Sequence, residues 1–443
     1  MAKQEWEKQI ASKRVLHNKL KQFFGVSLED LHIATRNFRV TSWPDIQPAI
    51  DNYFAVHSYV ELLGVKSERS AGEGLCMTAL LGSPALWSPE IAPIQYDEVP
   101  DIGERRLRNG LWLAVDNMPL AVLLQGTTVE IALAKDDQGL RYSEEFFKDL
   151  ENRINAAGTF RGKAISLECG RYGRESGVQV HKLRMVSREE VILPDKTLLL
   201  LERNVNAFMR VRQKIKNLGF SGKKGLLFYG PPGTGKTHSI HYLASQLPGH
   251  TTLLIPAGDI ENVAAYFDVA RFLQPSMIVI EDVDIIASAR NRVMGEEMSL
   301  NKLLNEMDGL RQDADVLIIL TTNRPDKLEP ALASRPGRID QAIEFPLPDD
   351  QCRARLIKLY ARGLALSEEL TDVIVRRTKG ASAAFIKELM RRSAQFHFEM
   401  GGNGALHQSA LDGALEEMLF SGGSLNLNLL GGSNIGFRAQ DAS

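Results

Sequence analysis

The segment Gly230–Thr237, GPPGTGKT, constrains the fold of this chain more than any other feature. It matches the pattern GxxxxGK followed by Ser or Thr, it follows the apolar stretch Gly225–Tyr229, and it precedes a predicted helix. Glycines let the backbone wrap closely, so that peptide N–H groups point at phosphate oxygens, and the helix adds the positive end of its dipole. The pattern therefore predicts a phosphate-binding loop between a strand and a helix of an α/β fold.

Two side chains of this loop have specific expected roles. Lys236 is expected to contact the β- and γ-phosphates, and the Thr237 hydroxyl is expected to bind Mg²⁺. A glycine-rich turn with a chance lysine is the alternative, which the flanking strand and helix disfavour. We therefore expect ATP and Mg²⁺ as cofactors. The residues expected to bind the nucleotide are Gly230, Pro231, Pro232, Gly233, Thr234, Gly235, Lys236, Thr237 and His238.

The stretch Met277–Asp284, MIVIEDVD, predicts a buried strand whose carboxyl end carries acids, the edge at which ligands bind in open parallel sheets. We expect Glu281 to hold Mg²⁺ and Asp282 to orient the attacking water. An apolar strand that ends in acids is common by itself. Its position after the phosphate loop favours the catalytic role.

Apolar strands alternate with helical stretches through this region, which predicts a parallel sheet covered by helices on both faces. The expected strands are Thr252–Ile255, Met277–Ile280, Val316–Leu320 and Ala342–Phe345. Helical patterns without strands follow over Gln351–Gly363, Glu368–Thr378 and Ser382–Phe398. The expected domains are an N-terminal α+β region at 1–187, a large nucleotide-binding subdomain at 188–347, a small helical lid at 348–420 and a flexible tail at 421–443.

The N-terminal region shows no catalytic constellation. Residues 1–70 have a helical pattern that includes Trp43–Leu63, and strand-like stretches follow from Leu75 to Leu167, with a hairpin expected at Asp116-Asn117. We expect this region to serve recruitment or assembly and to bind an unidentified protein client.

Composition excludes several classes of protein. Fifty-three basic and fifty-five acidic residues give a net charge of −2, without the positive field of a dedicated nucleic-acid binder. The three cysteines form no CxxC pair, which fits a reducing compartment. The N-terminus lacks the apolar core of a signal peptide, and the apolar run Leu75–Trp87 is too short to span a bilayer. We therefore expect a cytoplasmic protein without membrane insertion, and nucleic acid is not the expected partner.

Residues from about 190 to 400 resemble the AAA ATPases, the P-loop group that includes FtsH, the proteasomal regulatory ATPases and the Cdc48 family. After the two nucleotide motifs come LNEMDGL, then TTNRPDKLEPAL with Asn323, then SRPGRID with Arg335 and Arg338. The resemblance implies that Asn323 is a sensor residue and that both arginines complete the site of a neighbouring subunit in a homo-oligomer, a hexameric ring.

These residue types also suit the chemistry. Asn323, just after an expected strand, could hydrogen-bond the γ-phosphate or the attacking water. Arg335 and Arg338 flank a Pro-Gly turn, and their guanidinium groups could neutralise charge on the transferred phosphoryl group. A turn that carries solvated arginines is the alternative.

Three departures from the family pattern bear on mechanism. The usual acid order is Asp-Glu, and the order Glu281-Asp282 resembles that of the mitochondrial AAA chaperone that exports the folded Rieske protein. Because Asp is one methylene shorter, we expect slower hydrolysis rather than none. The interval Ile255–Ser276 lacks an aromatic–apolar–Gly pore triplet, so processive threading is not expected; Tyr266 and Phe267 are expected to pack in the core.

The lid carries the third departure. The segment TKGASAAFIKELMRRS resembles the sensor-2 region, but Ala383 and Phe385 replace its second Gly and its Asp. Lys387, Arg391 and Arg392 follow on the expected helix. One of them could reach a phosphate, and a solvated basic face is the preferred interpretation.

The leading hypothesis is an ATP-hydrolysing ring motor that remodels or disassembles protein complexes. One alternative is a nucleotide-gated assembly scaffold with negligible hydrolysis, which the inverted acids and the missing pore triplet favour. Another is a DNA-directed AAA+ accessory ATPase, which the neutral overall charge disfavours.

Overall fold

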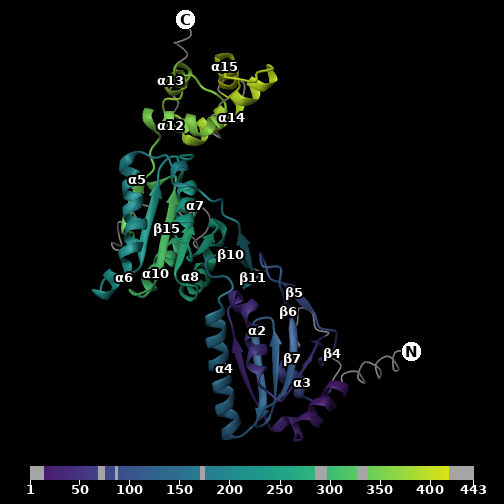
Figure 1. Cartoon of the computed structure of the whole chain (residues 1–443). Coiled ribbons are helices and arrows are strands. Elements are labelled where there is room, and N and C mark those ends of the chain that lie inside the picture. Colours follow the sequence, from purple (N-terminus) through teal and green to yellow (C-terminus); the bar gives the residue numbers. More distant parts are fainter. Residues whose placement is uncertain are drawn as a thin grey trace. The chain divides into compact units, whose positions relative to one another are not determined.

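The computed structural model describes residues 14–67, 75–84, 88–169, 175–284, 297–326 and 338–418 (Figure 1). Contacts divide the chain into two compact units, the first formed by Met1–Arg161 with Leu167–Val180 and the second by Gly162–Ser166 with His181–Ser443. The division falls within residues 161–181, shortly before the expected boundary at 187.

The first unit contains a five-stranded antiparallel sheet in the order β1-β9-β8-β7-β2. Its strands are β1 (Leu31–Asn37), β2 (Tyr59–Leu63), β7 (Asn109–Val115), β8 (Pro119–Gln125) and β9 (Thr128–Ala134). The expected hairpin is present, since β7 and β8 pair across the turn that contains Asp116-Asn117. Two short ladders pair β3 (Val65–Lys66) with β4 (Glu90–Ile91) and β5 (Tyr96–Glu98) with β6 (Arg105–Leu107).

Helices pack against both faces of this sheet, so its central strands are apolar at nearly every position. On one face, the Trp112 indole donates a hydrogen bond of 3.0 Å to Asp51 of α2 (Trp43–Phe54), which packs with α4 (Asp137–Ala157). On the other, Leu111 and its neighbours share a core with a helix over residues 14–24 and with α3 (Met77–Leu81).

The expected helical character of residues 1–70 is wrong in three places, of which the short strand β3 is one. The helix that begins at Trp43 ends at Phe54, and Leu31–Asn37 and Tyr59–Leu63 are strands at the two edges of the sheet. These two segments form strands because they pair with β9 and β7, and strand formation depends on cross-strand neighbours more than on local sequence pattern.

The second unit contains the parallel sheet, with strands in the order β13-β14-β15-β12-β16. These strands are β12 (Lys224–Tyr229), β13 (Thr251–Ile255), β14 (Ser276–Ile280), β15 (Val316–Thr322) and β16 (Gln341–Glu344), within two residues of the expected bounds. β10 (Ala164–Cys169) precedes β11 (Glu175–His181), and Ala164 and Ile165 pair in parallel with β13.

Helices flank this sheet, as expected. They are α5 (Asp195–Glu202), a π-helical segment (Arg203–Ala207), α6 (Phe208–Asn217), α7 (Lys236–Gln246), α8 (Val263–Phe272) and α10 (Glu297–Gly309). Leu226 and Phe228 of β12 share a buried cluster with side chains of α5 and α7. Tyr266 and Phe267 are fully buried where α8 packs against β13 and β14, which confirms the core role expected for them.

The lid is an all-helical extension of the second unit. It contains α12 (Asp350–Ala361), α13 (Glu368–Arg377), α14 (Ala383–Glu399) and α15 (Gln408–Glu416). The side chains of Asp349, Ser367 and Ser382 cap the first three of these helices. The sequence did not predict α15, which places Gly413 against the ring of Phe396. Among the described residues, no helix has the length and apolar character needed to cross a membrane.

Candidate nucleotide-binding site

The phosphate loop connects the carboxyl end of β12 to the start of α7. Its glycines are required by geometry. Gly230 has φ +146°, and a Cβ there would lie 2.2 Å from the Phe345 carbonyl oxygen; Gly233 has φ +74°. Gly235, with φ +100°, immediately precedes α7. Residues with a Cβ rarely adopt these backbone conformations, whereas glycine adopts them readily. The three glycines therefore allow a tight loop, and its backbone faces the cavity described below.

Lys236 is buried inside the loop. Its Nζ donates to the carbonyl oxygens of Gly230 at 2.8 Å and Pro231 at 3.0 Å, and to Asn323 Oδ1 at 2.8 Å. Burial lowers the pKa of Lys236, and the nearby carboxylates, Asp282 first, act in the opposite direction. A phosphate would compete with neutral oxygens for this ammonium group, and charge-assisted hydrogen bonds are the stronger ones.

The two acids after β14 face different partners. Thr237 Oγ1 donates to Glu281 Oε1 at 2.5 Å, which brings together the two expected Mg²⁺ ligands. Asn323 Nδ2 donates to Asp282 Oδ1 at 2.9 Å, and the Asp282 N–H donates to Thr321 Oγ1 at 3.0 Å. Asp282 has φ +51°, a left-handed conformation in which Asp is several-fold enriched.

Asp284 has a structural role that the sequence did not reveal. Its carboxylate is buried and accepts hydrogen bonds from Thr322 Oγ1 at 2.7 Å and from the Asn323 N–H at 3.1 Å. It therefore fixes the end of β15 and, through it, the position of Asn323. The signal in the sequence is its place in MIVIEDVD, at the same sheet edge as the other acids.

Of the expected arginine pair, Arg338 lies apart from these residues. Arg335 is outside the described residues. Arg338 forms an ion pair with Asp308 of α10, and its side chain is only 8% exposed. A Cβ on Gly225 would lie 2.3 Å from the Arg338 carbonyl oxygen, so Arg338 lies at the start of β12. The phosphate loop follows the other end of that strand, roughly 17 Å away at the usual rise per residue.

A cavity of about 360 Å³ adjoins the phosphate loop, within the size range of small-ligand sites. Part of its lining is apolar, and the apolar side chains include Val191, Ile192, Leu193, Leu356 and Tyr360. His238 lines it as well, and its Nε2 lies 3.1 Å from the Glu190 carbonyl oxygen. Burial lowers the pKa of His238, so the neutral ring is favoured. The lining thus offers apolar side chains for a base and the polar groups of the phosphate loop for phosphates.

The lid closes one side of this cavity. The Ala384 N–H donates to the Gly233 carbonyl oxygen at 3.1 Å, and a Cβ on Gly233 would lie 2.9 Å from Ser382 Oγ. Lys387, one turn along α14, lines the cavity.

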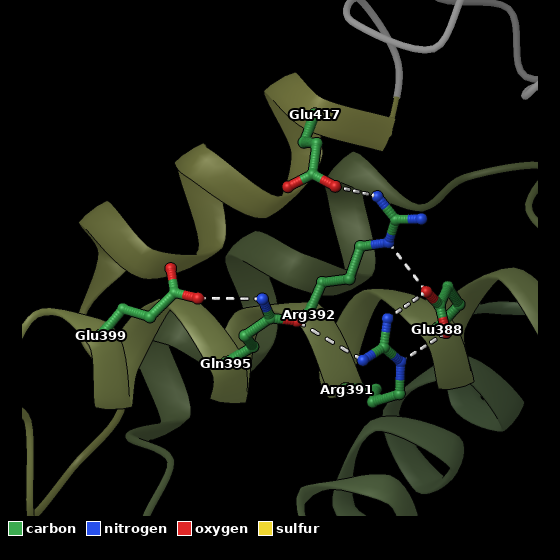
Figure 2. Close-up of polar contacts among 6 residues, drawn as sticks. All are labelled: Glu388, Arg391, Arg392, Gln395, Glu399 and Glu417. Carbon is green, nitrogen blue, oxygen red and sulfur yellow. Dashed lines mark hydrogen bonds and ion pairs between the residues drawn. The ribbon is translucent and has the colours of Figure 1, made fainter.

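The preferred interpretation of a solvated basic face is confirmed for Arg391, whose side chain is 60% exposed, whereas the side chain of Arg392 is 19% exposed and partly buried. Both donate to the Glu388 carboxylate, at 2.7–2.8 Å, and Arg392 also pairs with Glu417 of the neighbouring helical segment (Figure 2). These bonds lower the pKa of Glu388 to about 2. Within this stretch of α14, Lys387 is the cation that remains at the cavity.

Comparison with known proteins agrees with this architecture. Residues 226–347 match the ATPase family associated with various cellular activities (AAA). The chain is 31% identical over 235 residues to the proteasome-activating nucleotidase of Methanothermobacter thermautotrophicus, a match that covers 50% of this chain and 57% of that protein. It is 32% identical over 219 residues to 26S proteasome regulatory subunit S10B homolog B of Arabidopsis thaliana, covering 46% of this chain and 53% of that protein. The chain thus spans about half the length of these curated relatives.

Proposed function

Since residues 226–347 form an AAA module, a family match that implies nucleotide binding, we propose that this protein hydrolyses ATP in an oligomeric ring and uses the hydrolysis to remodel a protein client. One observation carries the proposal. At the carboxyl edge of the sheet, Lys236 and Asp282 are both hydrogen-bonded to Asn323, and Thr237 is hydrogen-bonded to Glu281, so that three separate segments of the chain meet there.

The residues at this edge suit Mg²⁺. The hydroxyl of Thr237 and the carboxylate of Glu281 are hard oxygen ligands on adjacent elements, and Mg²⁺ usually takes one or two such groups together with substrate phosphates and water. When bound, the ion neutralises charge on the β- and γ-phosphates. Lys236 and the backbone N–H groups of the loop would hold the same phosphates.

Asp282 and Asn323 suit the activation of water. The Asp282 carboxylate accepts one hydrogen bond from Asn323, which fixes its orientation and leaves its other oxygen for a water proton. In the proposed step the water oxygen bonds to the γ-phosphorus, its proton passes to Asp282, and the bond from that phosphorus to the ADP oxygen breaks. The products are ADP and phosphate.

The position of Arg338 supports an oligomer. It lies at the opposite end of β12 from the phosphate loop of its own chain, so any contact with a nucleotide requires a second copy. Such a contact also requires Arg338 to exchange its bond with Asp308 for one with a phosphate. We infer that Arg338, and Arg335 with it, completes the neighbour's site, and that the first unit selects the client.

The acid order supports two finer inferences. Together with the short interval before β14, the Glu281-Asp282 order favours kinship with the motor of the Rieske-exporting chaperone. A nucleotide-gated scaffold with negligible hydrolysis is the second candidate function. Two features of Asp282 favour it: the side chain is short, and its hydrogen bond with Asn323 holds the carboxylate close to the end of β15.

The test is ATP turnover per subunit against protein concentration, for the wild type, Arg338→Ala and Lys236→Ala. We expect wild-type turnover per subunit to rise with concentration, Arg338→Ala to stay low at every concentration, and Lys236→Ala to lose ATP binding. If the wild type binds ATP without turnover, the scaffold replaces the motor. If turnover per subunit is constant and Arg338→Ala matches the wild type, the shared site is refuted.

A further inference from the structure

The lid contains a second cavity, of about 390 Å³, between the end of α14 and the start of α15. It is lined by His397 of α14, by the turn Met400–Gly404, and by His407, Ser409 and Ala410 at the start of α15. These residues are distinct from those that line the nucleotide cavity. Among the described residues that line the second cavity none is acidic, so no carboxylate there would repel an anion.

His397 has a buried ring nitrogen without a partner. The residue is only 2% exposed, and its Nε2 forms no hydrogen bond with any residue that the structure describes. Gly402 lies directly over the ring, since a Cβ there would be 2.3 Å from His397 Cε1, and its N–H donates to the His397 carbonyl oxygen at 2.9 Å. A buried polar atom without a hydrogen bond is costly, so in a native protein it commonly marks the place of a water molecule or a bound ion.

The start of α15 supplies further donors to the same cavity. His407, at the N-cap, makes no side-chain capping bond, and in the described part of the chain the N–H groups of Gln408 and Ser409 have no acceptor. The first N–H groups of a helix lack partners within it, and the helix dipole makes this end positive. The rings of His397 and His407 are close, with centroids 5.9 Å apart. Donors from the end of one helix and the start of the next therefore converge.

The turn between the two helices is held in place by backbone bonds outside the cavity. The Leu406 N–H donates to the Ala365 carbonyl oxygen at 2.9 Å, and Ala405 forms a β-bridge with Ala365. The Gly401 N–H donates to the Phe398 carbonyl oxygen at 3.0 Å. These bonds fix the spacing of the donors before a ligand arrives, so little further ordering is needed on binding.

We propose that this cavity binds a phosphate group, carried by free phosphate or by a phosphomonoester. The inference does not depend on ATP hydrolysis. The positive helix end favours an anion over a metal cation, and the described residues contain no group of three or more His, Cys or acidic side chains that could hold a metal. A phosphate has more acceptor oxygens than a carboxylate, so it can use the imidazole, hydroxyl and backbone donors together. In the bound state His397 Nε2 carries a proton and donates it to a phosphate oxygen.

The experiment measures the rate at which diethyl pyrocarbonate modifies each histidine of the full-length protein, by mass spectrometry of its peptides. His407 is exposed and reports on this cavity, His238 reports on the nucleotide cavity, and His241, which lines neither, is the internal control. We expect inorganic phosphate to slow the modification of His407 at least about fivefold, with half of the effect at about 1 mM, the affinity of a few hydrogen bonds to a charged group. The rate at His241 should not change.

Other ligands and three variants define the chemistry. Acetate and NaCl at matched ionic strength should not protect His407. Protection by phosphoserine as well as by phosphate assigns the cavity to phosphomonoesters, and protection by phosphate alone assigns it to the free ion. His397→Ala should abolish protection, and Ser409→Ala, which changes an exposed side chain, should weaken phosphate binding about tenfold. Lys379→Ala removes an exposed lid cation outside the cavity and should match the wild type.

Several results would overturn the proposal. An unchanged rate at His407 excludes the site, and slower modification of His238 alone places phosphate in the nucleotide cavity instead. Equal protection of His407 by acetate or NaCl would reveal a general salt effect. Full protection in folded His397→Ala would exclude the buried nitrogen as a donor. If thermal melting shows that His397→Ala is unfolded, Ser409→Ala decides, and wild-type phosphate affinity in that variant refutes the assignment.

Discussion

Replacement of Asp282 by Asn is the sharpest test of the catalytic assignment, because it removes the base and keeps the shape. The Oδ1 of Asn can still accept the bond from Asn323 Nδ2, and Asn tolerates the left-handed backbone at this position, where φ is +51°. The fold and the nucleotide cavity should therefore survive. What is lost is the proton acceptor for the attacking water.

The expected loss in turnover is about 10²- to 10⁴-fold, the usual contribution of general base catalysis, or about 2.7–5.5 kcal/mol in activation free energy. ATP affinity should not fall. It should rise about two- to tenfold, because a negative charge is removed beside the site of the γ-phosphate. The assay pairs steady-state phosphate release with equilibrium binding of ATP.

Asp284→Asn is the matched control, since it makes the same change two residues along the chain. Asn at 284 keeps an oxygen that can accept from Thr322 and from the Asn323 N–H, so turnover should fall by less than about tenfold. Turnover in Asp282→Asn above a tenth of the wild-type value would refute the base role of Asp282. Equal losses in both variants would show that the charge of the cluster matters, rather than one proton acceptor.

Three further predictions concern the loop, the metal and the lid. Gly233→Ala should weaken ATP binding more than Gly249→Ala, which binding and thermal-melt measurements would show. Both glycines have positive φ, so Ala costs about 1–2 kcal/mol at either position. Only at Gly233 would the added Cβ contact the lid. Thr237→Ala should raise the Mg²⁺ concentration for half-maximal turnover about tenfold in a Mg²⁺ titration, and an unchanged midpoint would exclude Thr237 as a ligand. The pKa of Glu388 is lowered from 4.5 to about 2, so its ion pairs stabilise the fold above pH 4.5 and that contribution is lost as pH falls toward 2. Glu388→Gln should lose about 1 kcal/mol at pH 7 and have a flatter pH dependence of unfolding over that window, which urea titrations at several pH values would measure.

Most of the parallel sheet could be predicted from sequence because strands β12 to β15 are largely buried and therefore read as continuous apolar runs. The phosphate loop could be predicted because three glycines, a lysine and a threonine are required at fixed spacing. The edge strands β1 and β2 of the first unit could not, since each pairs with a strand far along the chain. The fourth lid helix has a glycine in its interior, which weakens the helical pattern.

Contacts between distant side chains were the least predictable part of the site. The motif that contains Arg338 is visible in the sequence, but its partner Asp308 is thirty residues earlier on another element. The same holds for the lid. Lys387, Arg391 and Arg392 look alike in sequence, and only the positions of Glu388 and Glu417 distinguish the two engaged arginines from the lysine at the cavity. The sequence pattern predicts the residue types at the site, but the packing of distant side chains determines which of them face a ligand.

The inverted acid order is compatible with function because the structure assigns partners by position rather than by residue type. The first acid lies opposite Thr237 and the second opposite Asn323. Glu281, the longer side chain, spans the gap between β14 and α7 to within 2.5 Å of the Thr237 hydroxyl. Asp282, the shorter one, has a left-handed backbone conformation in which Asp is enriched, and it accepts a hydrogen bond from Asn323. Because Asp284 holds the Asn323 backbone, the position of the proposed base, Asp282, depends on contacts among three residues.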